Sequence, residues 1–368
     1  MEQQTPPGAP EGRLASLDAL RGFTMFWIIG GAEMLRWFLR LFANPLPPAI
    51  AHQFEHSAWV GMTAWDLVMP LFLFIAGTSL PFSLERRLND AAGRRGVYRH
   101  LLKRSALLYL LGMIVGGNLL YFDPGRLYLF SNTLQAIACG CFVASLVVLH
   151  LNVHRQMLAC AALLAAYALV LRFVPIPGHA PGALEPELNL ARHVDRLLFG
   201  PYVDGSAYAW ALCIPAFGAS VLFGALAGQL LRTAWRPRVR LLVLAAAGLA
   251  LVLLGILFGY WMPIIKHIWT SSFALYAAGW SFLVLAVFYA VIDVLGCRRW
   301  AFGFVVIGTN ALFIYALTQF LGEYVTGDAR EEFAAVPPLQ GLALSVLAFA
   351  VFWTLLYGLY RKRIFIKL

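Results

Sequence analysis

Residues His56 to Ser79 read HSAWVGMTAWDLVMPLFLFIAGTS. After Asp66 the chain carries no further charged residue until Glu85. A membrane-spanning helix needs about 20 mainly apolar residues, so we expect a single helix over residues 57–84. This segment indicates the fold class, because a helix that is apolar on nearly every face belongs in a membrane or in a large apolar interior.

The same pattern recurs along the rest of the chain. Of its 368 residues, 61% are hydrophobic and 12% are charged. Soluble domains do not need so much apolar sequence, and the apolar runs are continuous rather than alternating, which favours helices over a β-barrel. We therefore predict an all-α integral membrane protein with about ten transmembrane helices, placed roughly at residues 17–41, 57–84, 102–121, 130–149, 157–174, 207–231, 241–262, 271–294, 301–325 and 338–360.

The positions of the basic residues indicate the orientation. The formal net charge is +10, but Lys and Arg fall in short clusters between apolar runs and do not form the basic domain that a nucleic-acid partner would need. Most of the 28 Lys and Arg lie on the same side as the chain ends, so the positive-inside rule predicts that both termini are cytoplasmic. We expect residues 1–14 to form a flexible cytoplasmic tail and residues 15–368 a single transmembrane domain. The longest outward loop, residues 175–206, is either a functional cap or disordered.

The second expected helix carries a regular set of residues. Every seventh position in it is polar or small, namely His56, Thr63, Pro70 and Gly77. This spacing places them on one helix face, with Asp66 next to that face and roughly 15 Å below His56 along the axis. Pro70 should remove the backbone bond to the carbonyl of Asp66 and open a polar spot in the bundle. At the outer start of this helix His56 can act as a general base; the alternative is an ordinary interfacial histidine.

Other ionisable residues in the expected helices have partners nearby in sequence. Asp18 and Arg21 are three residues apart and can form an ion pair on one helix face. Glu33 and Arg36 have the same spacing. For both pairs a structural role is favoured over a catalytic one.

Two further groups of residues are candidates for ligand binding. Residues 86–104 are strongly basic and include Lys103 and Arg104; topology and anionic lipid explain most of this charge, and a phosphate-bearing ligand is the alternative. Asn132 and Gln135 can each bond a neighbouring helix, or together help to line a passage. No HExxH or CxxC pair argues for a metal site.

Several segments resemble the transmembrane acetyltransferase family of heparan-α-glucosaminide N-acetyltransferase and its bacterial relatives. The matching stretches touch most of the membrane core, and the first two are the most specific. They are Arg13–Gly31 (RLASLDALRGFTMFWIIGG), His56–Ser79, Ser131–Gly140 (SNTLQAIACG), Asp204–Gly228, Trp269–Asp293 (WTSSFALYAAGWSFLVLAVFYAVID) and Gly308–Tyr315 (GTNALFIY).

This resemblance implies a role for particular residues. Acetyl-CoA would be used from the cytoplasmic side, and its acetyl group would reach an amino sugar on the far side. His56 stands at the position of the histidine that the family needs for transfer, and Asn44 matches an asparagine shortly before it. Asp66 would orient the site or hold a neighbouring helix. The residues expected to bind the donor are Lys103 and Arg104, which can meet CoA phosphates, with Asn132 and Gln135.

We therefore expect an acetyl-CoA-dependent acyltransferase in a bacterial inner membrane. Its partners would be acetyl-CoA, an amino sugar or glycan acceptor and membrane lipid, without nucleic acid, and a homo-oligomer is left open. His56 would either deprotonate the acceptor or form a transient acetyl-imidazole. The rival from another class is a membrane transporter whose polar helix face lines a substrate path, with His56 as a proton relay. An O-acyltransferase acting on cell-wall glycan differs only in its acceptor.

Overall fold

The computed structural model describes residues 14–88, 93–325 and 336–366 of the chain. Within these ranges the regular structure is helical, and the only β-type pairs are isolated bridges. Of the expected tail at residues 1–14, all but Leu14 lies outside the described residues. The α-helices are α1 (Ala15–Phe26), α2 (Ala32–Arg40), α3 (Pro48–Ala51), α4 (Val68–Thr78), α5 (Leu80–Leu88), α6 (Gly93–Val115), α7 (Thr133–His150), α8 (Val153–Phe173), α9 (Leu190–Phe199), α10 (Ile214–Arg232), α11 (Pro237–Gly259), α12 (Ser271–Tyr289), α13 (Phe302–Thr309), α14 (Ala311–Val325) and α16 (Pro338–Arg361).

The all-α architecture is confirmed, together with several helices suited to a membrane. In the described part of the chain, seven helices are long and apolar enough to cross a bilayer, or up to eight if the pair Arg299–Thr309 and Ala311–Phe320, bent by 65°, is one span. The expected segments 17–41 and 102–121 are also largely helical, but the first includes five charged residues and the second includes two. The number of ten crossings therefore stays a prediction. The seven are Trp65–Glu85, Thr133–His150, Val153–Phe173, Ile214–Arg232, Pro237–Gly259, Ser271–Val294 and Pro338–Arg361.

The expected helix over residues 57–84 is wrong in its first part. Residues 55–64 form an irregular loop, and the helix begins with the 3-10 turn Trp65–Leu67 that leads into α4. The Thr63 hydroxyl accepts a hydrogen bond from the backbone N–H of Asp66 (3.3 Å), and the Asp66 carboxylate accepts one from the N–H of Thr63 (3.1 Å). This reciprocal pair caps the helix. His56 and Thr63 therefore do not share a helix face with Pro70.

Pro70 does not disturb the helix that contains it. It is the third residue of α4, a position at which the backbone N–H of any residue would have no partner within the α-helix. The expected polar opening at this proline is therefore not formed by a broken helix. The polar site that the structure does contain lies one turn earlier, around Asp66.

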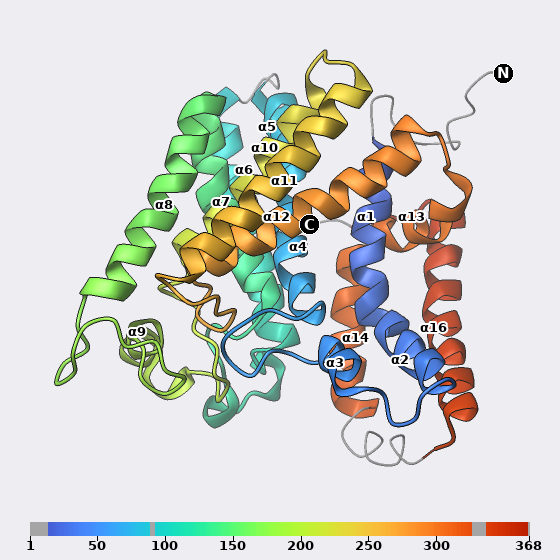
Figure 1. Ribbon diagram of the computed structural model, residues 1–368, viewed down its shortest axis with the longest axis horizontal. Helices are drawn as coiled ribbons and strands as arrows, with labels where there is room; N and C mark the ends of the chain where they lie inside the picture. Colours follow the sequence, from blue (N-terminus) through green and yellow to red (C-terminus); the bar gives the residue numbers. More distant parts are fainter. Residues whose placement is uncertain (1–13, 89–92, 326–335, 367–368) are drawn as a thin grey trace.

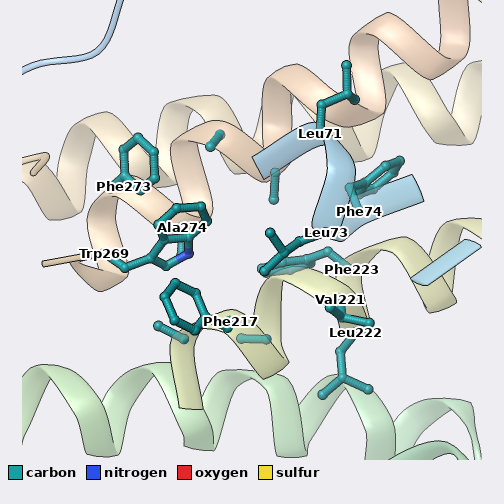
Figure 2. Packing of buried hydrophobic residues seen from close by; sticks show 14 of the residues in the cluster. Leu71, Leu73, Phe74, Phe217, Val221, Leu222, Phe223, Trp269, Phe273 and Ala274 are labelled. Carbon is teal, nitrogen blue, oxygen red and sulfur yellow. The ribbon is translucent and has the colours of Figure 1, made fainter. Parts of the chain in front are cut away.

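The core is built around α4, α10 and α12. Phe74 of α4, Phe217 of α10 and Trp269 at the start of α12 belong to one buried cluster (Figure 2). Two glycines allow α4 and α10 to touch along their backbones. A Cβ on Gly77 would lie 1.9 Å from the carbonyl oxygen of Val221, and one on Gly224 would lie 1.9 Å from that of Phe74. Small residues at such contacts are typical of membrane helices, whose association depends on close packing.

The structure confirms both expected ion pairs in the first helices. Arg21 Nη1 lies 3.1 Å from Asp18 Oδ1, and Arg21 Nη2 also donates to the hydroxyl of Ser79 (3.0 Å). Arg36 Nη1 lies 3.7 Å from Glu33 Oε1. Arg21 thus joins α1 to the junction of α4 and α5, which supports its structural interpretation.

The ends of the helix bundle differ in their connections. The short helices α3 and α9 lie at the end where α4 begins, and α5 lies at the opposite end (Figure 1). The long loop at residues 175–206 contains α9 and the 3-10 turn Gly200–Tyr202. The carboxylate of Asp195 ties it to the chain before α10, because it accepts hydrogen bonds from the N–H groups of Trp210 (2.7 Å) and Ala211 (2.9 Å). The loop is therefore ordered, and its role as a functional cap stays a prediction.

Candidate active site

Three connections meet at the end of the bundle where α4 begins. The loop that carries His56 pairs with residues 260–270, where the N–H of Gly61 donates to the carbonyl of Ile264 (2.8 Å). Residues 260–270 in turn contact residues 203–213, where the N–H of Ala209 donates to the carbonyl of His267 (2.9 Å). The middle connection therefore presents its side chains to both of the others.

Asp66 is the buried centre of this region, with no exposed side-chain surface. Its Oδ2 accepts hydrogen bonds from the backbone N–H groups of Ser57 and Thr63, both at 3.1 Å. Its Oδ1 lies 2.7 Å from His56 Nδ1 and 2.9 Å from Lys266 Nζ. A buried carboxylate needs such donors and a counter charge to remain ionised. The loop at residues 56–63 is folded around this side chain, which explains why it does not continue the helix.

The expected separation of roughly 15 Å between His56 and Asp66 is wrong. It assumed a straight helix, whereas the loop turns back and brings His56 Nδ1 to 2.7 Å from Asp66 Oδ1. The His56 side chain is 48% exposed, and among the described residues its Nε2 has no hydrogen-bond partner. When Nδ1 carries the ring proton and donates to Asp66, the Nε2 lone pair is free to accept a proton from outside. The arrangement is that of a carboxylate-oriented general base.

Lys266 is the third member of the cluster, and it is not among the site residues predicted from the sequence. Its side chain is 3% exposed, and its Nζ lies 2.9 Å from Asp66 Oδ1 and 2.9 Å from His56 Nδ1. Its ammonium also lies 5.6 Å from the ring centre of Tyr208. Burial lowers the pKa of Lys266, and the nearby carboxylate of Asp66 opposes that shift. One signal in the sequence was available: Lys266 is the only Lys or Arg between Arg240 and Arg298.

Three aromatic rings pack together beside the lysine, those of Trp59, Tyr208 and His267. The ring of His267 stacks on Trp59 with centroids 5.0 Å apart and lies 4.5 Å from the ring centre of Tyr208. Burial, followed by the charge of Lys266, lowers the pKa of His267 to about 4, so this second histidine stays neutral near neutral pH. Trp59 Nε1 donates to the carbonyl of Leu184 in the loop at residues 175–206 (2.7 Å). This loop and the candidate site are thus directly connected.

The structure does not bring the other candidate residues into this cluster. Asn44 lies in an exposed loop after α2. Asn132 caps α7 by accepting from the N–H groups of Leu134 and Gln135, and the amide of Gln135 donates to the carbonyl of Leu129 (2.6 Å). Among the described residues, none of these side chains takes part in the hydrogen bonds around Asp66.

The two basic candidates lie on α6. Lys103 is exposed, and Arg104 is half-buried. Arg104 borders a cavity of about 10 Å³ between α6 and α7, together with Ser105, Cys141 and Ser145. This space holds roughly one water molecule. In the described ranges, no three His, Cys, Asp or Glu side chains come together as metal ligands would.

Comparison with known proteins gives one family. Residues 13–257 match the family model described as heparan-alpha-glucosaminide N-acetyltransferase, catalytic. The human and mouse proteins named heparan-alpha-glucosaminide N-acetyltransferase are 24% and 23% identical to this chain over 425 aligned positions. Each alignment covers 97% of this chain and 60% of the relative, so the chain spans about three fifths of the length of these curated relatives.

Proposed function

Because the chain belongs to the heparan-alpha-glucosaminide N-acetyltransferase catalytic family, we propose that it is a membrane enzyme that transfers acetyl from cytoplasmic acetyl-CoA to an amino sugar or glycan at the outer face. The observation that carries this proposal is the His56–Asp66 contact of 2.7 Å. It combines a buried, fully bonded carboxylate with an exposed imidazole edge. That is the arrangement a general base for acyl transfer requires.

The chemistry assigned to His56 follows from its free nitrogen. As the acceptor amine attacks the thioester carbonyl, its N–C bond forms and the C–S bond breaks. His56 Nε2 takes the proton from the attacking nitrogen and passes it to the departing thiolate, so that no net proton is lost. Asp66 holds the ring in the required tautomer through Nδ1. A transient acetyl-imidazole on His56 is the alternative route, and acetylation of His56 in the absence of acceptor would distinguish the two.

Donor binding is proposed at the opposite, basic end. Lys103 and Arg104 would meet the phosphates of CoA, and the pantetheine arm would follow a path through the helix bundle. Asn132 and Gln135 would line that path, and Asn44 would assist His56. A charged nucleotide cannot cross lipid cheaply, so a division into inner donor and outer acceptor sites is physically reasonable.

The proposed orientation has both termini in the cytoplasm, ten crossings and the His56 cluster outside, in a bacterial inner membrane. The positive-inside rule supports it, since the basic segment at residues 86–104 adjoins α5. This helix lies at the end of the bundle opposite to α3 and α9 (Figure 1). The apolar surfaces of α11 and α16, which are largely unburied, support contact with lipid.

The test uses purified protein in proteoliposomes, with radiolabelled acetyl-CoA on one side and glucosamine on the other. His56→Ala should lower acetyl transfer by at least about 100-fold, the usual range for loss of a general base. His52→Ala, which removes an exposed histidine four residues earlier in the same loop region, should retain the activity. Equal acetylation by wild type and His56→Ala would refute the assignment. Glucosamine that crosses the bilayer unmodified would instead indicate the transporter, and mass spectrometry of the product distinguishes N- from O-acetylation.

A further inference from the structure

We propose that Lys266 is a positioning residue that acts through His56: its ammonium opposes a second positive charge on the imidazole and so keeps His56 neutral and able to accept a proton. The part that Lys266 plays in catalysis rests on the proposed function. The charge relation itself is a property of three side chains and can be measured without any transfer reaction.

The three groups form a triangle of short contacts. Lys266 Nζ lies 2.9 Å from both Asp66 Oδ1 and His56 Nδ1, and the last two atoms are 2.7 Å apart. The lysine and the aspartate are almost fully buried, with 3% and 0% of their side chains exposed. Charges in such a place interact more strongly than charges in water, because neither solvent nor salt screens them.

The possible protonation states of the His56 ring show why Lys266 disfavours the imidazolium. A neutral ring with its proton on Nδ1 donates to Asp66, and a neutral ring with its proton on Nε2 accepts at Nδ1 from the ammonium of Lys266. Both neutral forms therefore have a partner for Nδ1, and the form that donates to Asp66 leaves Nε2 free to accept a proton. An imidazolium can also donate to Asp66, but it then places a second cation 2.9 Å from the first. Like charges at this distance disfavour the charged form.

The remaining titratable groups around the ring do not replace this effect. His267 is neutral near neutral pH, since its pKa is lowered to about 4. Burial raises the pKa of the Tyr208 phenol, so that this group is neutral as well. Glu55 is exposed and lies 3.9 Å from Arg36. Asp204 accepts hydrogen bonds from Ser206 and Trp210. Within the described residues, Asp66 and Lys266 are thus the two charges in contact with the ring, and they act on it in opposite directions.

The experiment measures the protonation of His56 directly. Diethyl pyrocarbonate reacts with neutral imidazole, so its rate of reaction with the exposed His56, followed by mass spectrometry of the peptide across pH 5–9, reports a midpoint. We use the full chain in detergent micelles. Lys266→Met leaves Asp66 alone beside the ring and should raise the midpoint by about one pH unit or more. Asp66→Asn leaves the ammonium alone and should lower it. Lys362→Met removes an exposed lysine and should leave the midpoint unchanged.

Opposite shifts in two variants are a result that simple structural damage would not give. A midpoint that stays constant or falls in Lys266→Met overturns the proposal. If that variant does not fold, Lys266→Gln, which also removes the charge, takes its place: a higher midpoint supports the proposal, and a constant or lower midpoint overturns it.

The transfer assay then separates the two proposals. If the midpoints shift as expected but wild-type protein transfers no acetyl, the proposed function is wrong and the charge relation stands. If transfer occurs and the acid limb of its pH profile does not move in Lys266→Met, the role of Lys266 in the reaction is refuted.

Discussion

Asp66 combines two roles that are usually served by different residues. One carboxylate oxygen accepts the N–H groups that shape the loop and cap the helix, and the other faces His56 and Lys266. Truncation of this side chain therefore affects the loop, the helix cap and the contacts of His56 together. A substitution that keeps its shape is needed to separate them.

A buried ion pair should make Asp66→Ala strongly destabilising. The variant leaves the Lys266 ammonium buried without a counter charge, and breaking such a pair costs about 3–5 kcal/mol. Thermal unfolding in detergent should show a lower Tm for Asp66→Ala. Asp66→Ala combined with Lys266→Met should recover part of the loss, because no unpaired charge remains. A double variant no more stable than Asp66→Ala would show that the pair contributes little.

His267 should make the fold sensitive to acid. An unfolded chain binds a proton at this residue near the ordinary pKa of 6.5, whereas the folded protein binds it only near a pKa of about 4. Unfolding therefore takes up a proton between these values, and stability falls as the pH is lowered from about 6.5 to about 4. At about 1.4 kcal/mol per pH unit, this loss is up to about 3 kcal/mol.

The control for this effect is His267→Phe, which keeps a ring between Trp59 and Tyr208. Its Tm should fall less than that of wild type when the pH is lowered from 7 to 5. Parallel losses in the two proteins would show that the acid sensitivity has another source.

At the scale of elements, the contact between α4 and α10 holds the start of α4 in place. Its glycines bring two backbones together at positions where no Cβ fits. The Thr63–Asp66 cap then fixes where the helix begins. The site therefore depends on helix packing several turns away from His56.

Gly224→Ala should destabilise the protein and lower its activity. The added methyl group would meet the carbonyl oxygen of Phe74 at 1.9 Å, and overpacking of this kind costs about 1–3 kcal/mol or more. Gly358→Ala in α16 is the matched control, because nothing lies within 4 Å of its Cβ and alanine favours a helix by up to about 1 kcal/mol. Thermal unfolding of both variants would test this. A Gly224→Ala protein as stable as Gly358→Ala would mean that α4 and α10 separate easily.

At the scale of the whole molecule, the proposed function depends on which side of the membrane each end of the helix bundle faces. The loop at residues 175–206 contacts the loop that carries His56. Its helix α9 lies at one end of the bundle and α5 lies at the other (Figure 1). The transfer that we propose needs these ends to lie in different compartments.

Labelling with a membrane-impermeant maleimide should reveal this orientation. Cys297 is exposed and adjoins Arg298 and Arg299, so in intact spheroplasts it should react only after permeabilisation. Glu185→Cys in a Cys297→Ser background should react without permeabilisation, since residue 185 is exposed in the loop at residues 175–206. The reverse pattern would invert the proposed topology, and with it the sides of donor and acceptor.

The sequence alone predicts the helical membrane class and the ion pair between Asp18 and Arg21, and it marks His56 and Asp66 as candidates. These follow from properties read locally, namely hydrophobicity over about 20 residues and spacing by helical turns. The same local rules failed at residues 57–64. There the sequence keeps a helical periodicity, but hydrogen bonds to the buried carboxylate of Asp66 stabilise a loop. The Thr-x-x-Asp pattern at Thr63 to Asp66 was the signal that marks the true start.

Which charges surround His56 depends on contacts between distant parts of the chain. Lys266 is 210 residues away in sequence, and nothing in its own neighbourhood indicates a partner. It reaches His56 because the packing of α4, α10 and α12 brings the ends of distant helices together. The energetic need of a buried carboxylate for a counter charge then joins the two side chains.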